Sequence, residues 1–179
     1  MKDFDYSQSS VYFVTICTHD RAHLFGEIVT EPIESPLCGR PPALRCHPNY
    51  PDRIVTKWLF EIENKYANAE IVQYIIMPDH IHFIILNPGI LDEQTGDHTG
   101  SPLPQMVDWF KTMTTNEYIK GVKAGLFPPF DKHIWQRSYY EHVIRNEEDY
   151  QKTATYIDEN PQKWAIDHDA EAASPSLKE

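Results

Sequence analysis

Cysteine is scarce in this sequence, and long apolar runs are missing from it. The 179 residues include three cysteines, Cys17, Cys38 and Cys46, and no two of them have the CxxC spacing of a structural zinc site. A small, odd number of cysteines argues against a disulfide framework and fits a reducing cytoplasm. No apolar run reaches the roughly 18 residues of a membrane span, and MKDFDYSQSS lacks the apolar centre of a secretory leader. We therefore expect one cytoplasmic domain with no membrane partner.

The sequence also has fewer basic than acidic residues. Sixteen Lys and Arg stand against 27 Asp and Glu, which gives a net charge of −11. This composition argues against a nucleic-acid partner, because phosphate binding normally needs a basic face. The distribution of charge weakens that objection, because residues 104–145 hold six Lys and Arg, four acids and eight aromatic residues. The chain is acidic overall and has one mildly basic, aromatic-rich segment.

Hydrophobic spacing predicts seven secondary-structure elements. The apolar, β-branched runs at 11–17, 71–77 and 80–86 are typical of strands, and Pro78-Asp79 joins the last two as a hairpin. Apolar residues at three- and four-residue intervals predict helices over 52–66 and from 103 to about 120. An extended segment is predicted over 134–144. A last helix is predicted from Asn146, as its N-cap, to about Asn160, where Pro161 stops it.

The order of the first six elements is strand, helix, strand, strand, helix, strand, which is the ferredoxin-like βαββαβ arrangement. We expect an α+β fold in which an antiparallel sheet carries helices on one face, with an added C-terminal helix. Six prolines between residues 30 and 52 exclude a helix or a central strand there and indicate an irregular insertion. The domain is expected to span residues 5–164, and residues 165–179 to form an acidic, flexible tail.

His80-Ile81-His82 is the first candidate site. Residues i and i+2 of a strand point to the same face, so both imidazoles would project together and could hold one divalent metal. An isolated HxH is more often a pair of surface histidines. Here the histidines interrupt an apolar hairpin, where two buried imidazoles without a role would be unfavourable. A third ligand would come from another element.

The last predicted helix contains the second candidate site. Tyr156 lies off the apolar stripe of this helix, and Asn160 follows one turn later on the same side. A phenol can act as a nucleophile, and an amide oxygen can bind a metal. A packing tyrosine and a C-cap asparagine explain the same spacing, and spacing alone favours that explanation. The stripe itself is formed by Tyr150, Ala154 and Ile157.

The sequence around the two sites has a recognisable pattern. The blocks YFVTICTHDRAHLFGEI, YIIMPDHIHFIIL, LPQMVDWFKTMTTNEY, IWQRSYYEHVIRNEEDY and YIDENPQKW follow one another in this order. In these blocks the chain resembles the single-tyrosine HUH transposases, the group that includes the REP-associated tyrosine transposases. The resemblance runs from about residue 5 to residue 164, which is nearly the whole chain.

This resemblance implies roles for four residues. His80 and His82 match the HUH histidines, and Tyr156 matches the nucleophile. Asn160 stands at the position of the third metal ligand. Such enzymes use Mg²⁺ or Mn²⁺ and cleave single-stranded DNA near hairpins through a 5′-phosphotyrosine intermediate. The implied function is a metal-dependent DNA transposase, an endonuclease and strand transferase that acts on hairpin-associated DNA as a monomer or homodimer.

Several basic and aromatic residues are candidates for contacts with DNA. Arg137 and Arg145 flank SYYEHVI and could contact phosphates or pair with nearby glutamates. Lys111 is expected on a solvated helix face that could also help to bind DNA. His142 could make a structural hydrogen bond or a catalytic contact. The residues Trp135, Tyr139 and Tyr140 could stack on bases, although core packing is the commoner role.

Three other interpretations stay open. The chain could be a domesticated, non-catalytic protein that binds a DNA hairpin without cutting it, so that Tyr156→Phe would leave its activity unchanged. It could instead be a metal-dependent nucleotide hydrolase built on the HxH pair, although such hydrolases place a third histidine where this chain has Ile84. Tyr150 is a rival nucleophile, but it falls on the apolar stripe of its helix.

Overall fold

The computed structural model describes residues 10–26, 28, 51–66, 69–87 and 103–172. They form β1 (Ser10–Cys17), the 3₁₀ turn η1 (His19–Arg21), α1 (Pro51–Lys65), β2 (Glu70–Met77), β3 (His80–Asn87), α2 (Leu103–Lys123), β4 (Tyr140–Ile144) and α3 (Glu147–Ala172). The four strands make one antiparallel sheet in the order β2-β3-β1-β4. The predicted α+β fold and its βαββαβ order are confirmed. Residues 30–50 of the predicted insertion lie outside the described residues.

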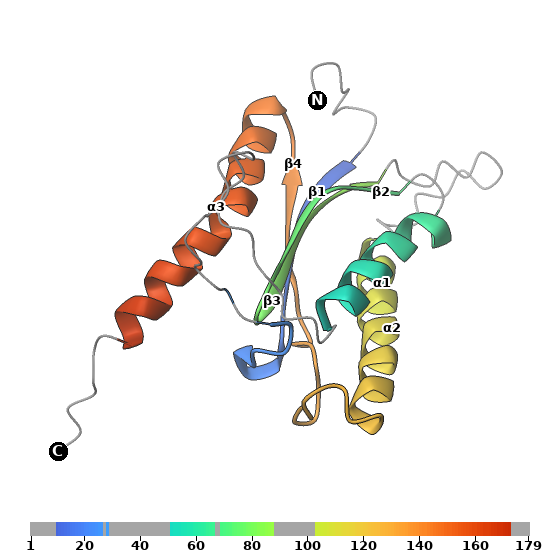
Figure 1. Cartoon of the computed structure of the whole chain (residues 1–179). Coiled ribbons are helices and arrows are strands. Elements are labelled where there is room, and N and C mark those ends of the chain that lie inside the picture. The colour runs from blue at the N-terminus through green and yellow to red at the C-terminus, as the bar shows by residue number, and fades with distance from the viewer. Residues whose placement is uncertain (1–9, 27, 29–50, 67–68, 88–102, 173–179) are drawn as a thin grey trace, which may run out of the picture.

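Helices α1 and α2 cover one face of the sheet (Figure 1). Each turns a stripe of apolar residues inward at helical spacing, and each stripe packs against the β-branched and aromatic residues of the strands. The two helices are also tied to each other, because Glu117 of α2 accepts hydrogen bonds from Lys57 and Trp58 of α1. The inward residues of the helices are Ile54, Val55, Leu59, Ile62, Leu103, Met106, Val107 and Phe110.

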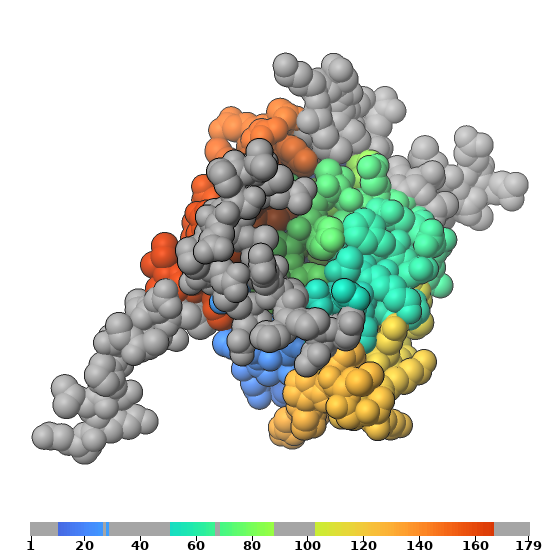
Figure 2. All heavy atoms as spheres, in the orientation of Figure 1, coloured from blue at the N-terminus to red at the C-terminus, as the bar shows by residue number. Residues whose placement is uncertain are grey.

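Helix α3 covers the opposite face of the sheet (Figure 1), and in the space-filling view green strand atoms are visible between the atoms of α3 and those of α1 (Figure 2). Its apolar contact with the sheet is small and centres on Ile157, which packs with Phe13, Ile84 and Ile144. Tyr150 also packs against this cluster, while the polar residues Thr153 and Asn160 are buried on the same helix. A helix held by so short an apolar stripe leaves room for polar side chains between itself and the strands. Within the described residues no helix is long and apolar enough to cross a membrane.

The predicted extended segment over 134–144 is only partly a strand. Regular pairing with β1 begins at Tyr140, and before it the chain makes one isolated bridge between Thr18 and Trp135. The reason is that the side chain of Trp135 turns into the core, where its Nε1–H donates to Thr114 over 2.9 Å. The carbonyls of the following residues bond to Lys111 instead of to a neighbouring strand.

The prediction that Pro161 stops the last helix is wrong. The helix starts as expected, because the side chain of Asn146 accepts a hydrogen bond from the backbone N–H of Asp149 over 2.9 Å. It then continues through Pro161 to Ala172, so residues 165–172 of the expected flexible tail are helical. A proline inside a helix costs about 3 kcal/mol but does not forbid the helix. Asn160 and Pro161 are both buried, so packing at this point offsets the cost.

Candidate active site

Strand register brings the two histidines to the face of the sheet that α3 covers. Along the β1–β3 ladder His80 lies opposite Cys17, and His82 lies opposite Thr15. Both imidazoles are buried, and their ring centroids are 4.6 Å apart. Ile81, between them, points to the other face and joins the main core. The shared projection predicted from the HxH spacing is therefore present.

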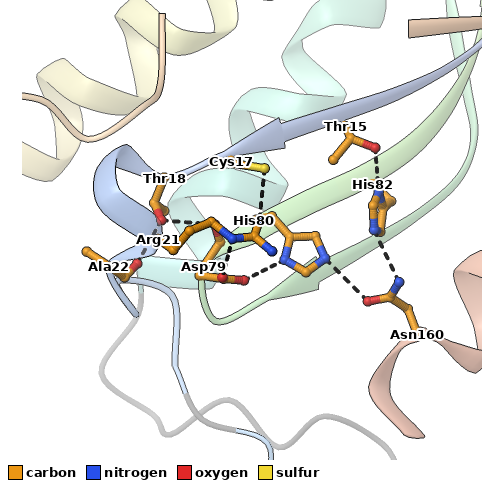
Figure 3. Close-up of polar contacts among 9 residues, drawn as sticks. All are labelled: Thr15, Cys17, Thr18, Arg21, Ala22, Asp79, His80, His82 and Asn160. Carbon is orange, nitrogen blue, oxygen red and sulfur yellow. Dashed lines mark hydrogen bonds and ion pairs between the residues drawn. The ribbon is translucent and has the colours of Figure 1, made fainter. Parts of the chain in front are cut away.

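Asn160 of α3 completes a cluster with the two histidines (Figure 3). Its amide oxygen lies 3.3 Å from His80 Nε2, and its amide nitrogen lies 3.2 Å from His82 Nε2. The side chain is buried. Three residues that the sequence placed on two distant elements thus meet at one point between α3 and the sheet.

The hydrogen bonds of the cluster decide where the imidazole protons sit. His80 Nδ1 lies 2.5 Å from the carboxylate of Asp79, which favours the tautomer with the proton on Nδ1 and a lone pair on Nε2. The amide nitrogen of Asn160 donates to His82 Nε2, and His82 Nδ1 therefore donates to Thr15 Oγ1 over 2.7 Å. Burial lowers the pKa of His82 to about 3, with help from the nearby guanidinium of Arg21, so this ring is neutral at neutral pH. Both Nε2 lone pairs face Asn160.

This donor set fits a divalent cation. The lone pair of His80 Nε2 faces the amide oxygen of Asn160, and two acceptors at 3.3 Å have no proton to share. A cation bound between them would satisfy both. Two imidazole nitrogens and one amide oxygen would leave coordination positions for phosphate and water, and the nitrogens favour Mn²⁺ over Mg²⁺, which prefers oxygen. The described residues contain no group of three His, Cys, Asp or Glu side chains that could hold a metal, so a cation bound at the two histidines would need the amide oxygen of Asn160 as its third protein ligand.

Asp79 and Arg21 support His80 from behind, and neither was identified from the sequence. Asp79 is buried, and its second carboxylate oxygen accepts from Arg21 Nε over 2.9 Å (Figure 3). Burial alone would raise the pKa of Asp79, but the hydrogen bond from His80 and the charge of Arg21 lower it below its ordinary value. A carboxylate on the far nitrogen of a metal-binding imidazole fixes its tautomer and orientation.

The loop after β1 holds Arg21 in place. Thr18 donates its backbone N–H and its hydroxyl to the carbonyl of Asp79 over 2.8 and 2.9 Å. Arg21 itself has a positive φ of 55° and sends a second donor to Cys17 Sγ over 2.9 Å. The ion pair between Arg21 and Asp79 can be recognised only from the tertiary contact between this loop and the β2–β3 turn. In the sequence its sole signal is that an aspartate immediately precedes the HxH.

Tyr156 faces the same space as the histidines. Its side chain is 40% exposed, and its ring centroid lies 5.2 Å from that of His82 and 6.0 Å from that of Phe13. Lys163 Nζ lies 5.4 Å from the same ring. Tyr150, the rival nucleophile, packs with the small cluster under α3, and burial raises its pKa. Of the two tyrosines on α3, only Tyr156 lines the cleft between the helix and the sheet.

That cleft has a volume of about 780 Å³. The sheet forms one wall, which carries His80 and His82, and α3 forms the other, which carries Tyr156 and Asn160. His142 also reaches it, and its Nε2 donates to the carboxylate of Asp149, with 3.0 Å to each oxygen. The lining residues are Phe13, Thr15, Arg21, His80, His82, Tyr140, His142, Lys152, Thr153, Tyr156, Asn160, Lys163 and Trp164.

The three basic residues expected to contact DNA do not line this cleft. Lys111 is half-buried, its Nζ donates to the backbone carbonyls of residues 136–138, and burial lowers its pKa. Arg137 lines a separate hollow beside Lys111. Arg145 is exposed just before α3. The cations at the cleft are instead Arg21, Lys152 and Lys163.

Comparison with known proteins shows one sequence relative and a fold shared with a solved transposase structure. No protein-family model matches the chain. An uncharacterized protein of Haemophilus influenzae is 29% identical over 176 residues, covering 93% of this chain and 88% of its own. The structure of a REP-associated tyrosine transposase bound to a REP hairpin is similar over 91% of this chain and 74% of the other, with a TM-score of 0.51 and 21% identity.

A second solved structure, a candidate transposase from Deinococcus radiodurans, matches 90% of this chain and 97% of its own. Its TM-score is 0.47 and its identity 17%. The likeness to the hairpin-bound transposase shows the fold: the chain has the architecture of a REP-associated tyrosine transposase, including the C-terminal helix.

Proposed function

We propose that this protein is a metal-dependent DNA transposase of the REP-associated tyrosine type, which cleaves and rejoins single-stranded DNA beside a hairpin. One observation carries the proposal. Tyr156 and Asn160, one turn apart on α3, face the imidazoles of His80 and His82 across a single cleft. A fold shared with a transposase that binds a REP hairpin supports the choice of substrate.

A divalent cation held by His80, His82 and Asn160 would neutralise charge on the scissile phosphate and orient the phosphorus for in-line attack. The phenolic oxygen of Tyr156 attacks that phosphorus and gives up its proton. The bond from phosphorus to the 3′-oxygen breaks, and this oxygen takes a proton and leaves as a 3′-hydroxyl. The DNA is then joined to the protein through a 5′-phosphotyrosine.

The second half of the reaction reverses the first. A 3′-hydroxyl from the same or another strand attacks the phosphotyrosine, the new phosphodiester forms, and Tyr156 regains its proton. One phosphodiester is exchanged for another, so strand transfer needs no nucleotide cofactor. Covalent catalysis of this kind divides a difficult displacement into two similar steps.

Contacts with the hairpin would lie outside the cleft. Arg137 and Arg145 are exposed and suit phosphate binding there. Lys111 suits it less, because three backbone carbonyls already bind its ammonium group. The overall charge of −11 implies that such contacts are local.

A cleavage assay tests the proposal. Labelled single-stranded DNA with a hairpin, taken from the flanks of the gene itself, is incubated with the protein and Mn²⁺ or Mg²⁺ and resolved on a denaturing protein gel. We expect a covalent protein–DNA band that is lost in Tyr156→Phe and His80→Ala. Tyr150→Phe, the matched change on the same helix, keeps the band. Binding on a native gel with no adduct in either metal would overturn the enzymatic function and favour a non-catalytic hairpin-binding protein.

A further inference from the structure

The cleft extends beyond the residues that the proposed chemistry uses. The β1–β3 and β1–β4 ladders place His82, Thr15 and Tyr140 in one row across three strands. Neighbouring strands are about 4.8 Å apart, so Tyr140 stands roughly 10 Å from His82 along this row. Phe13 links the row to α3, because its ring contacts both Tyr140 and Tyr156 at centroid distances of 6.3 and 6.0 Å.

Tyr140 is the one aromatic residue of its segment that is available to a ligand in the cleft. Its side chain is 59% exposed, and it lines the cleft. Trp135 is buried, with its indole N–H bound to Thr114. Tyr139 packs against the main core under the ammonium of Lys111, and burial raises its pKa to about 12. An exposed aromatic ring supported at its edge is the usual platform on which a base of a single strand stacks.

Two lysines of α3 lie on either side of Tyr156. Lys152 precedes it by four residues and Lys163 follows it by seven, which is about 6 Å and 10 Å along a helix that rises 1.5 Å per residue. Both line the cleft. Their partners are Glu148 and Glu159, in exposed i,i+4 ion pairs that contribute little and exchange readily for another anion.

Arg21, the third cation of the cleft, is not available in this way. Its partner Asp79 is buried, and leaving that carboxylate without Arg21 would be unfavourable. The side chains of Lys152 and Lys163 are 72% and 53% exposed, so they can turn to a phosphate without uncovering a buried charge.

We propose that the cleft is a track for one DNA strand, in which Tyr140 stacks on a base next to the scissile phosphate while Lys152 and Lys163 contact backbone phosphates on the two sides of Tyr156. This inference rests on the proposed function and names the side chains that hold its substrate. Stacking and phosphate contacts tolerate any sequence, and a paired strand cannot offer the face of a base. The track therefore selects single-stranded DNA and concentrates positive charge where an acidic protein needs it.

DNA binding by the full chain carrying Tyr156→Phe tests the stacking contact. This variant lacks the proposed nucleophile, so it cannot cleave the DNA or become covalently joined to it. Oligonucleotides carry 2-aminopurine at successive positions around the cleavage site, and its fluorescence reports stacking. We expect quenching at one position, retained in Tyr140→Phe and lost in Tyr140→Leu. The affinity of Tyr140→Leu should fall about 5- to 150-fold relative to Tyr140→Phe. An abasic site at that position should weaken binding to Tyr140→Phe but not to Tyr140→Leu.

Salt dependence tests the lysines. Lys152→Gln and Lys163→Gln should each reduce the slope of log affinity against log salt by about 0.7 to 1, because each removes one phosphate contact. Lys120→Gln, an exposed lysine of α2 on the other side of the sheet, should leave the slope unchanged. Thermal unfolding of each variant verifies that the fold is kept.

The outcomes separate this inference from the function on which it rests. If the wild type forms the covalent adduct but Tyr140→Leu binds as tightly as Tyr140→Phe, the stacking site is wrong and the transposase remains. Unchanged salt slopes in both lysine variants would overturn the phosphate contacts in the same way. If the chain neither binds single-stranded DNA nor forms the adduct, both proposals fail.

Discussion

Replacing Asp79 by asparagine probes the support behind the candidate metal ligands. Asp79 accepts on both oxygens, from Arg21 Nε and from His80 Nδ1. Asparagine offers one acceptor and one donor in their place. If its oxygen faces Arg21, its NH₂ faces His80 and forces the imidazole proton onto Nε2, where the metal would bind. If its oxygen faces His80, its NH₂ faces the guanidinium and drives Arg21 away.

The size of the effect follows from these two mismatches. Loss of a carboxylate behind a metal-binding histidine typically weakens metal affinity 10- to 100-fold, or about 1.4 to 2.7 kcal/mol. The free energy of unfolding without metal should fall by roughly 1 to 3 kcal/mol, because a buried polar group loses a partner. Calorimetric titration with Mn²⁺ gives the first quantity, and urea unfolding in EDTA gives the second.

Asp131→Asn is the matched control, because Asp131 lies in an exposed loop and pairs only with the exposed Lys132 among the described contacts. It should leave both quantities unchanged. A folded Asp79→Asn protein that binds Mn²⁺ within twofold of the wild type would refute the reasoning. Asp79 would then be a structural link between the β2–β3 turn and the loop after β1.

Three further predictions concern stability. The pKa of His82 is about 3 in the folded protein and about 6.5 in an unfolded chain, so between these pH values the unfolded chain binds one more proton than the folded protein. The free energy of unfolding in EDTA should therefore fall on acidification below pH 6.5, by up to about 1.4 kcal/mol per pH unit. In urea unfolding, the free energy of unfolding of His82→Gln should depend less steeply on pH. Gly121→Ala gains about 1 kcal/mol in helix propensity, but its Cβ would lie 2.0 Å from the Phe127 ring, so overpacking should dominate and lower the melting temperature. Asn146→Ala removes the N-cap of α3 and should cost about 1 kcal/mol in chemical unfolding, where a result near zero would mean that the helix start is held by tertiary contacts alone.

The strand pattern and the HxH spacing were enough to predict most of the fold and the shared face of two candidate site residues, His80 and His82. A period of two residues in β3 sends His80 and His82 to one face whatever the rest of the chain does. The N-cap at Asn146 is likewise a local signal, and the structure bears it out. Tyr156 and Asn160 were assigned through a resemblance, because their spacing alone is equally typical of packing residues.

What the sequence did not predict depends on tertiary contacts. The partnership of Arg21 with Asp79 joins a loop to a turn nearly 60 residues away, and no periodic pattern marks it. The end of α3 was misplaced because the cost of Pro161 was weighed without the burial of its neighbours. A count of basic residues along the chain suggested Lys111, but only the structure shows its ammonium engaged by three carbonyls.

The same limit applies to the aromatic residues before α3. Trp135, Tyr139 and Tyr140 are close in sequence and similar in composition, so composition cannot divide them. The structure buries the first, packs the second on the core and leaves the third exposed in the cleft. The division follows from the short β4 strand, because regular pairing from Tyr140 onward turns alternate side chains toward α3.

The most direct test of the central claim is to locate the atom that carries the DNA. The protein is incubated with hairpin-bearing single-stranded DNA and Mn²⁺, digested with nuclease and protease, and analysed by mass spectrometry for a tyrosine that retains a nucleotide. We expect one modified peptide, with the 5′-phosphate on Tyr156, and none in a sample with EDTA. A nucleotide on Tyr150 or Tyr140, or cleavage of the DNA with no modified tyrosine, would contradict it.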